Sequence, residues 1–253
     1  MLYVATVHFR SPRWIEIQSE HLKRHLRTPY EVWTSLEGID PSYEDRFDRV
    51  LKSRGSHAEK LNHLALEICH VADPADLLMF LDGDAFPIID PLPLIEAGLA
   101  SSDLVAVRRA ENLDEPQPHP CFCVVTAGTW KSLAADWTAG YTWPPGVTDV
   151  GGNLLRRLEL GEVTWTEVLR SNGDRLDPLN FAIYGDAIYH HGEGFRTGGL
   201  SPVHRKSAPR GSGPLNRLRW IMWERRERRR IGRVSQEIYE AILSDNGWQQ
   251  RIA

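Results

Sequence analysis

Strand-like and helix-like segments alternate over the first part of this chain, and this order constrains the fold more than any other feature. The strand-like segments are rich in β-branched and aromatic residues and cover 2–9, 30–36 and 77–82. The helix-like segments carry start signals or apolar residues at helical spacing and cover 11–26 and 56–72. The alternation predicts an α/β fold with a mainly parallel sheet and helices on its faces.

The rest of the 253-residue chain extends this pattern. Further strands are expected over 103–110, 121–127, 162–170 and 181–191, and helices over 129–140, 153–160 and about 215–243. Segment 37–55 is predicted to be irregular, and segment 142–152 to be a loop. We expect a main domain over 1–197, a linker or mobile loop rich in Gly, Pro and Ser over 198–216, and a basic helical extension over 217–253.

The segment LLMFLDGDAFPI, residues 77–88, ends an apolar strand in two aspartates. Carboxylates that lie close together repel each other and resist burial, so Asp82 and Asp84 are expected to share a cation. Carboxylate oxygens suit a hard divalent ion such as Mg²⁺, and Gly83 leaves room for a ligand to approach. Parallel sheets bind ligands at the carboxyl ends of their strands, which is where this pair stands. A plain turn rich in Asp and Gly is the alternative.

The sequence resembles the glycosyltransferases of the GT-A fold, which use nucleotide-sugar donors. The resemblance rests on FLDGDAFPI, which looks like the Asp-x-Asp signature of that family, and on SHAEKLN, CFCVV, DVGGNLL and YHHGEGFR. Together these segments cover about residues 1–197. The resemblance implies a Rossmann-like GT-A catalytic domain over those residues, a nucleotide-sugar donor, and a sugar, lipid-linked or small-molecule acceptor.

In enzymes of this family, the signature aspartates bind a Mn²⁺ or Mg²⁺ ion that bridges the diphosphate. Carried over, Asp82 would contact the donor ribose or the metal, and Asp84 would bind the metal. A histidine from a late strand often joins them, which implies His190 or His191 here. Because neighbouring residues on a strand point to opposite faces, only one of the two can face the site, and the sequence leaves the choice open.

Two further regions are candidate parts of the donor site. His57 and Lys60 lie one turn apart near the start of the expected helix 56–72, where backbone N–H groups favour an anion. The end of the first strand offers Thr6, His8 and Arg10, and the resemblance implies that the nucleotide base is held there. For each of these residues an ordinary packing or surface role is the alternative.

Asp149 stands before two glycines and an expected helix, in TDVGGNLL. The resemblance places this region beside the acceptor, where a carboxylate can act as general base and take the proton of the attacking hydroxyl. A helix N-cap is the alternative role for Asp149. The sequence leaves open whether configuration is inverted or retained, which donor and acceptor are used, and which oligomer forms.

Charge is distributed unevenly along the chain. Between Arg217 and Arg233, eight arginines and two glutamates give a balance of +6, so the remainder carries −10 of a net charge of −4. Apolar residues and tryptophans are interleaved with these arginines. The pattern is compatible with peripheral contact to an anionic membrane or with a solvated helix packed on the acidic body. A nucleic-acid partner is not expected, because the rest of the chain is acidic.

Cysteine content and the N-terminal residues bear on the compartment. The three cysteines, at positions 69, 121 and 123, form no Cys-x-x-Cys pair, which favours a reducing setting. The N-terminus has no basic signal-peptide region, and no apolar run reaches the roughly 18 residues that span a bilayer. We therefore expect a cytoplasmic protein, free or peripheral on the inner face of the membrane.

Two other functions are compatible with an Asp-x-Asp sequence after an apolar strand. Phosphatases of the haloacid dehalogenase type use the first aspartate as a nucleophile, but their motif usually lies on the first strand and is normally followed by Thr or Val, where this chain has Ala85. A non-catalytic GT-A-like protein that binds nucleotide sugars would be expected to lose its metal ligands. A metal-dependent glycosyltransferase is therefore the function we expect.

Overall fold

The structure is a computed structural model that describes residues 1–140, 142–143, 146–173, 177, 179–192, 200, 202–205, 207–209, 211–244 and 247–252. The strands are β1 (Leu2–Phe9), β2 (Tyr30–Glu37), β3 (Arg49–Leu51), β4 (Leu77–Phe80), β5 (Ala85–Pro87), β6 (Leu104–Arg108), β7 (Pro118–Thr126), β8 (Thr142–Trp143), β9 (Gly146–Val147), β10 (Trp165–Val168), β11 (Ala182–Tyr184) and β12 (Ile188–His190). The helices are α1 (Ile15–His25), the 3₁₀ helix η1 (Pro41–Arg46), α2 (His57–Val71), α3 (Leu92–Leu99), α4 (Ala127–Ser132), α5 (Gly152–Leu160), α6 (Pro202–Arg205), α7 (Pro214–Leu243) and α8 (Gln249–Ile252).

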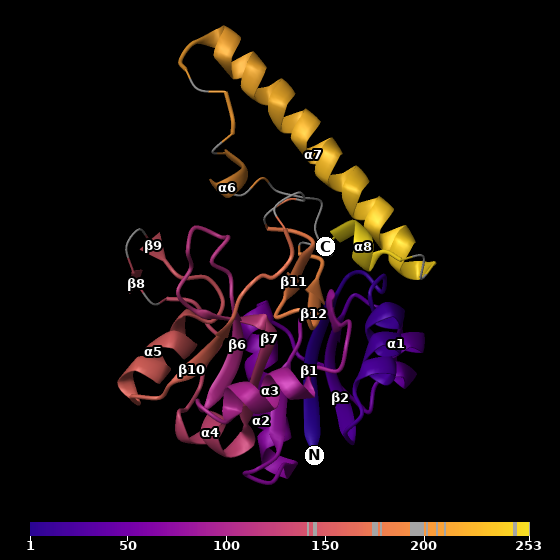
Figure 1. Cartoon of the computed structure of the whole chain (residues 1–253), viewed down its shortest axis with the longest axis vertical. Coiled ribbons are helices and arrows are strands. Elements are labelled where there is room, and N and C mark those ends of the chain that lie inside the picture. Colours follow the sequence, from indigo (N-terminus) through magenta and orange to yellow (C-terminus); the bar gives the residue numbers. More distant parts are fainter. Residues whose placement is uncertain are drawn as a thin grey trace.

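The central sheet has seven strands in the order β10-β6-β7-β4-β1-β2-β3 (Figure 1). Four neighbouring pairs are parallel, and β7 runs antiparallel to both β6 and β4. The expected α/β fold, with a mainly parallel sheet, flanking helices and a C-terminal helix, is thus confirmed. Because β1, β2 and β4 are parallel, their carboxyl ends lie on the same side of the molecule.

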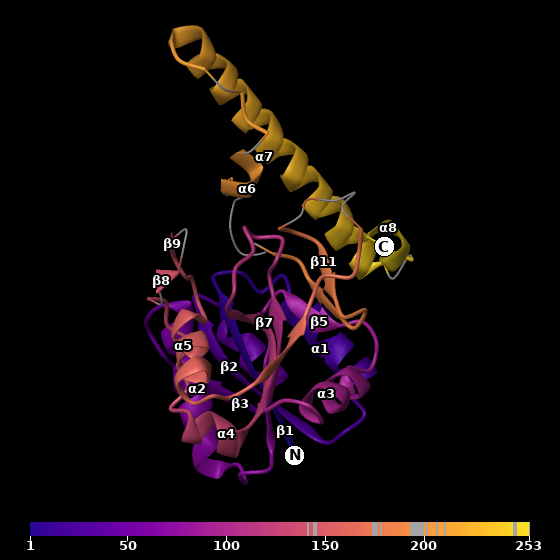
Figure 2. The ribbon, with the colours of Figure 1, turned by 60° about the vertical axis from the view of Figure 1, so that its left-hand side comes forward.

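Side-chain alternation along the strands divides the core into two layers. On β1, Tyr3, Ala5 and Val7 pack with residues of α2, α4 and α5, whereas Leu2 and Val4 pack with residues of α1 and α3. Figure 2 shows these two groups of helices on opposite sides of the sheet. Neighbouring residues of β1 therefore meet different helices, as the two-residue period of a strand requires.

Local signals explain where two of the helices begin. The predicted capping box starts α2: Ser56 Oγ accepts a hydrogen bond from the Glu59 N–H, and the Glu59 carboxylate accepts one from the Ser56 N–H. The prediction that a helix begins at Ser11 is wrong. The Ile15 N–H bonds to the Pro12 carbonyl oxygen, which closes a turn, and α1 begins only at Ile15.

Several other predicted elements differ from the structure. Segment 181–191 is a hairpin of β11 and β12, because Gly185 and Asp186 turn the chain with φ angles of 54° and 56°. Segment 37–55 contains η1 and β3, segment 129–140 has only the short α4, and segment 142–152 contains β8 and β9. Neither β5 nor α3 is predicted, because β5 is short and ends in a proline and prolines flank the start of α3.

The C-terminal part consists mainly of the long helix α7. The predicted linker 198–216 lies partly outside the described residues, and its described part contains α6 and the start of α7. The last turns of α7 and the short α8 pack on Trp14, Phe86 and Tyr189 in a third apolar cluster. Among the helices that the structure describes, none has the length and apolar content to cross a membrane.

Candidate functional site

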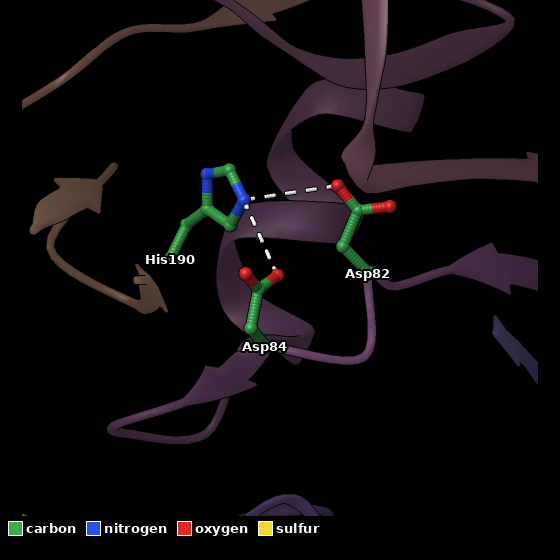
Figure 3. Close-up of side chains that lie close together, drawn as sticks. All are labelled: Asp82, Asp84 and His190. Atoms are coloured by element: carbon green, nitrogen blue, oxygen red, sulfur yellow. Dashed lines mark ion pairs between the residues drawn. The ribbon is translucent and has the colours of Figure 1, made fainter. Parts of the chain in front are cut away.

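Two aspartates and one histidine meet where β4, β5 and β12 come together. Asp82 lies just beyond the end of β4, and Asp84 directly precedes β5. β12 pairs antiparallel with β5, with His190 opposite Ala85. The His190 Nε2 atom consequently lies 3.5 Å from Asp84 Oδ1 and 3.7 Å from Asp82 Oδ2 (Figure 3). The cluster thus depends on the pairing of two strands that are far apart in the sequence.

The three side chains fit a divalent cation. One oxygen from each carboxylate and one imidazole nitrogen all lie within 4.8 Å of one another. Asp84 and His190 are buried, and Asp82 is partly buried. Two carboxylates at this separation repel each other unless a positive charge lies between them. Oxygen ligands with one imidazole are compatible with Mg²⁺ or Mn²⁺.

His191 points away from this cluster. Its Nδ1 pairs with the Tyr189 hydroxyl at 2.8 Å and its Nε2 with the Ser235 hydroxyl of α7 at 2.7 Å, and its ring centroid lies 4.3 Å from that of Trp14. Burial lowers the pKa of His191 to about 3, which keeps the ring neutral. Of the two histidines that the sequence leaves open, His190 lies beside the aspartates, and His191 forms a hydrogen bond with Ser235 of α7.

Three imidazoles surround Asp82. His57 Nε2 is 2.9 Å from Asp82 Oδ1, and nitrogens of His119 and His190 lie 4.0 Å and 3.7 Å from Oδ2. Burial alone would raise the pKa of the Asp82 carboxyl. The hydrogen bond from His57 and the nearby imidazoles outweigh burial and hold this pKa below its ordinary value. Asp82 is therefore an anion at neutral pH, which is the form that binds a cation.

Gln18 of α1 holds the turn that carries the aspartates. Its Nε2 donates hydrogen bonds to the carbonyl oxygens of Asp82 and Ala85, each at 2.8 Å. Its Oε1 lies 3.2 Å from Thr6 Oγ1 and 3.2 Å from His8 Nε2. Thr6 and His8 are buried and face α1, so the structure does not place them where a nucleotide base could contact them. No sequence pattern marks Gln18, because a single glutamine within an expected helix is an ordinary surface residue by its type.

A pocket of about 560 Å³ opens over Asp82, Asp84 and His190, which we call the metal-type cluster. Its lining includes six of the residues that the sequence singles out, namely His57, Lys60, Asp82, Asp84, Asp149 and His190. Val7 and Phe9 present the other face of β1 to the pocket. Val7 and Phe9 line the pocket and Thr6 and His8 do not, because neighbouring residues of a strand point to opposite faces.

Two other predicted residues lie outside this lining. Arg10 is exposed, with its guanidinium 4.6 Å from the centroid of the Phe9 ring. Gly83 is buried within the turn between the aspartates. Neither side chain is among the residues that line the pocket. The expected ligand contacts of Arg10 and Gly83 are thus not supported by the geometry.

Lys60 reaches the pocket from the first turn of α2. Its side chain is only 3% exposed, and its Nζ donates a hydrogen bond of 2.5 Å to Glu37 Oε2. This hydrogen bond lowers the pKa of Glu37. The Lys60 Nζ also lies 5.0 Å from the centroid of the Phe9 ring. Lys60 is thus a fixed cation that Glu37 orients beside the apolar end of β1.

Arg109, His119 and Asn180 also line the pocket, although sequence reasoning does not single them out. Arg109 follows β6, and its Nη2 donates a hydrogen bond of 3.2 Å to the Leu179 carbonyl oxygen. Its buried Nε makes no hydrogen bond to any residue that the structure describes, and it lies 3.7 Å from a Glu111 carboxylate oxygen. Arg109 falls inside the segment expected to be a strand, 103–110, so no local signal marks it as a pocket residue.

Asp149 stands at the exposed margin of the pocket. The N-cap of α5 is Gly151, at a φ of 94°, and no side chain caps this helix. A side chain at Gly151 would collide with the Pro118 carbonyl oxygen, so glycine is needed at that position. The alternative role of Asp149 as a helix N-cap is therefore wrong, and its carboxylate is available to the pocket.

Comparison with known proteins finds no matching family model and no matching curated protein. Solved structures similar to this chain include a mannosyltransferase and a glycosyltransferase. The mannosyltransferase PcManGT from Pyrobaculum calidifontis, in complex with GDP-Man and Mn²⁺, is 15% identical with a TM-score of 0.47, over 69% of this chain and 57% of that one. S. aureus TarS 1–349 is 11% identical with a TM-score of 0.46, over 76% and 60%. The apo form of the glycosyltransferase GlyE of Streptococcus pneumoniae TIGR4 is 14% identical with a TM-score of 0.43, over 66% and 44%. The chain thus spans 60% or less of the length of each.

Proposed function

We propose that this chain is a metal-dependent glycosyltransferase of the GT-A fold, which moves a sugar from a nucleotide-diphosphate donor to an acceptor hydroxyl. The observation that carries the proposal is the convergence of Asp82, Asp84 and His190 on one wall of a pocket at the carboxyl ends of a mainly parallel sheet. The pocket volume lies in the usual range for small-molecule sites. The Asp-x-Asp resemblance of the sequence supports the same reaction.

Asp82, Asp84 and His190 are the residues that would hold Mn²⁺ or Mg²⁺. When bound, the ion supplies positive charge that stabilises a diphosphate leaving group. The depressed pKa of Asp82 keeps that ligand ionised. His57, hydrogen-bonded to the opposite oxygen of the same carboxylate, fixes its orientation.

Other pocket residues supply contacts to the donor. Arg109 lines the pocket and offers a guanidinium group, and guanidinium groups bind phosphate oxygens well. Lys60 adds a second cation, which Glu37 holds in place. Val7 and Phe9 form an apolar wall against which a nucleotide base can pack.

Asp149 is the general base in this proposal. Its carboxylate lies at the open side of the pocket, where an acceptor hydroxyl can enter. The carboxylate would take the proton of that hydroxyl as the oxygen attacks the anomeric carbon, and the bond from that carbon to the diphosphate breaks. A base in this role belongs to an inverting reaction, so we propose inversion of configuration.

A thermal-shift experiment tests the donor site. The full chain is incubated with nucleoside diphosphates of five bases, each with Mn²⁺, with Mg²⁺ or with a chelator. A ligand that binds only the folded state raises the melting temperature. We expect a metal-dependent rise for one nucleotide, its loss in Asp84→Asn and His190→Gln, and its retention in Asp186→Asn. Asp186 is the matched control because it is an exposed aspartate in the turn between β11 and β12.

Release of the nucleoside diphosphate from the matching nucleotide sugar then tests turnover. Absence of any nucleotide shift in the folded protein would contradict the proposal. Metal-dependent hydrolysis of a phosphomonoester that requires Asp82 would instead identify a phosphatase of the haloacid dehalogenase type. Nucleotide-sugar binding without turnover over a broad acceptor panel would identify a non-catalytic binding protein.

A further inference from the structure

The first half of α7 projects away from the rest of the molecule (Figures 1 and 2). No described residue of α7 before Ile231 is buried, whereas Ile231, Ile238, Ala241 and Ile242 are. This second half contacts the body. Ser235 forms a hydrogen bond with His191, and the guanidinium carbon of Arg13 lies 3.6 Å from the centroid of the Tyr239 ring. The helix is therefore anchored at one end and extends from the body at the other.

One side of the projecting half combines aliphatic side chains with arginines. We call the side of α7 that carries Ile231, Ile238 and Ile242 the anchoring side. Successive helical residues are rotated by about 100°, so the residues on the opposite side form one continuous strip. We define the outer face of α7 as Leu215, Leu218, Arg219, Ile221, Met222, Arg225, Arg226 and Arg229. Its aliphatic members are 36% to 75% exposed. These four large aliphatic side chains are exposed together on one side of one helix. Apolar side chains grouped in this way on a surface often mark a binding site.

Charge on the outer face has a single sign. Both glutamates of this segment, Glu224 and Glu227, lie on the anchoring side, where they pair with Arg228 and Arg230. Within the part of the chain that the structure describes, the four arginines of the outer face form no ion pair with the acidic body. Arg230, which is not part of the outer face, lies 3.8 Å from a carboxylate oxygen of Asp177 in the body. The sequence-based alternative, a helix packed on the body through its arginines, therefore applies to Arg230 and does not account for the outer face.

The tryptophans do not belong to the outer face. Trp220 and Trp223 lie on the anchoring side of the helix, and their ring centroids are 6.3 Å apart. Both are partly buried, in contrast to the aliphatic residues opposite them. The apolar part of the outer face is therefore aliphatic and sits at the free end of the helix, with Arg225, Arg226 and Arg229 following in the next turns.

We propose that the outer face of α7 binds the surface of an anionic lipid bilayer. Helices that lie in a membrane interface insert aliphatic side chains between the lipids and place arginines at the phosphate level. This arrangement uses both components of the outer face. A second copy of this chain could pair its acidic body with the arginines, but an acidic surface would leave the four aliphatic side chains without apolar contacts. The phosphate backbone of a nucleic acid would likewise pair with the arginines and leave the aliphatic side chains without apolar contacts.

The proposed membrane face lies at the same end of the molecule as the pocket. β1 runs from the N-terminus at one end toward the end from which α7 projects (Figure 1). The pocket includes Val7 and Phe9 at the carboxyl end of β1. Contact through α7 would thus bring the pocket near the membrane, which suits a lipid-linked acceptor. The membrane proposal rests on α7 alone, and its test requires no nucleotide and no turnover.

Vesicle sedimentation tests the proposal with the full chain. Phosphatidylcholine vesicles are compared with vesicles that also contain phosphatidylglycerol. We expect at least about tenfold stronger binding to the anionic vesicles, and weaker binding as salt is raised. One variant, Leu218→Glu with Met222→Glu, tests the aliphatic part of the outer face. The other, Arg225→Gln with Arg226→Gln and Arg229→Gln, tests its charge. Each should reduce binding to anionic vesicles about tenfold or more.

Matched controls come from α5, whose outer residues are equally exposed. Leu160→Glu changes an aliphatic side chain that is 69% exposed, and Arg156→Gln with Arg157→Gln removes two exposed arginines. These variants should bind vesicles as the parent chain does, and all variants should retain its melting temperature. Failure of the folded parent chain to bind anionic vesicles would overturn the proposal. So would equal losses in the α5 controls, or a salt-dependent dimer that forms through the same arginines without any vesicle binding.

Discussion

The side-chain amide of Gln18 donates a hydrogen bond of 2.8 Å to the backbone carbonyl oxygen of Asp82. A second hydrogen bond of the same length reaches Ala85, and the amide oxygen of Gln18 contacts Thr6 and His8. Gln18 is only 1% exposed. One buried side chain of α1 thereby connects β1 to the turn that carries Asp82 and Asp84, two of the three proposed metal ligands.

Replacement of Gln18 should therefore affect both stability and metal binding. Gln18→Leu removes the amide donor from the Ala85 carbonyl oxygen and one of the two donors from the Asp82 carbonyl oxygen, which still accepts the Ala85 N–H. A buried unsatisfied group costs about 1–3 kcal/mol. We expect the free energy of unfolding in urea to fall by at least that amount. The metal-dependent rise in melting temperature should also shrink, because the Asp82–Ala85 turn loses its support.

Gln117→Leu is the control for this experiment. Gln117 is equally buried, but its amide atoms make no hydrogen bond to any residue that the structure describes. The same substitution there should cost less or stabilise the chain, since it removes buried polar atoms and keeps apolar volume. Equal losses at both positions would contradict the role assigned to Gln18.

Arg109 should contribute strongly to donor binding. Arg109→Met removes a guanidinium from the pocket wall and should weaken binding of the matching nucleoside diphosphate about 10- to 100-fold, because hydrogen bonds to charged groups are worth about 1.5–3 kcal/mol. Isothermal titration with Mn²⁺ present measures this affinity. The neighbouring Arg108 is the control, since it pairs with Asp114 and Glu167 and does not line the pocket. Equal affinities for Arg108→Met and Arg109→Met would refute the phosphate role.

Asp149 should affect turnover and leave donor binding intact. Asp149→Asn removes the proposed base but keeps the shape of the side chain, so we expect kcat to fall about 10²- to 10⁴-fold. The nucleotide-dependent thermal shift should match that of the parent chain, because Asp149 does not contact the metal-type cluster in the proposal. A variant with full turnover would show that another group accepts the proton.

Stability should decrease on the acidic side of neutrality. Burial lowers the pKa of His8 from 6.5 to about 4. The unfolded chain therefore takes up a proton between about pH 6.5 and pH 4 that the folded chain excludes, and the free energy of unfolding falls as the pH falls through this window. The difference between the two pKa values corresponds to about 3 kcal/mol at most.

Urea unfolding of metal-free protein at pH 7.5, 6 and 5 measures this effect. His8→Gln should show a weaker dependence on pH than the parent chain. Some dependence should remain, because burial also lowers the pKa of His191 to about 3 and acts in the same direction. An unchanged pH dependence in His8→Gln would mean that the proton is taken up elsewhere.

The sequence by itself determined the class of fold and part of the site. The alternation of strand and helix signals predicted the mainly parallel sheet, because the periods of strands and helices are local properties. Asp82 and Asp84 were recognisable because an apolar strand that ends in two carboxylates costs electrostatic energy without a cation. His57, Lys60 and Asp149 were also predicted, and each lines the pocket.

Tertiary structure alone decided the remaining assignments. His190 rather than His191 joins the aspartates, since the register of β12 against β5 sets which face each histidine occupies. Phe9 rather than Thr6 or His8 reaches the pocket because α1 covers the other face of β1. Gln18 and Arg109 come from distant segments and carry no local signal. Contacts between segments far apart in the chain depend on how the elements pack, whereas strand and helix periods depend only on neighbouring residues.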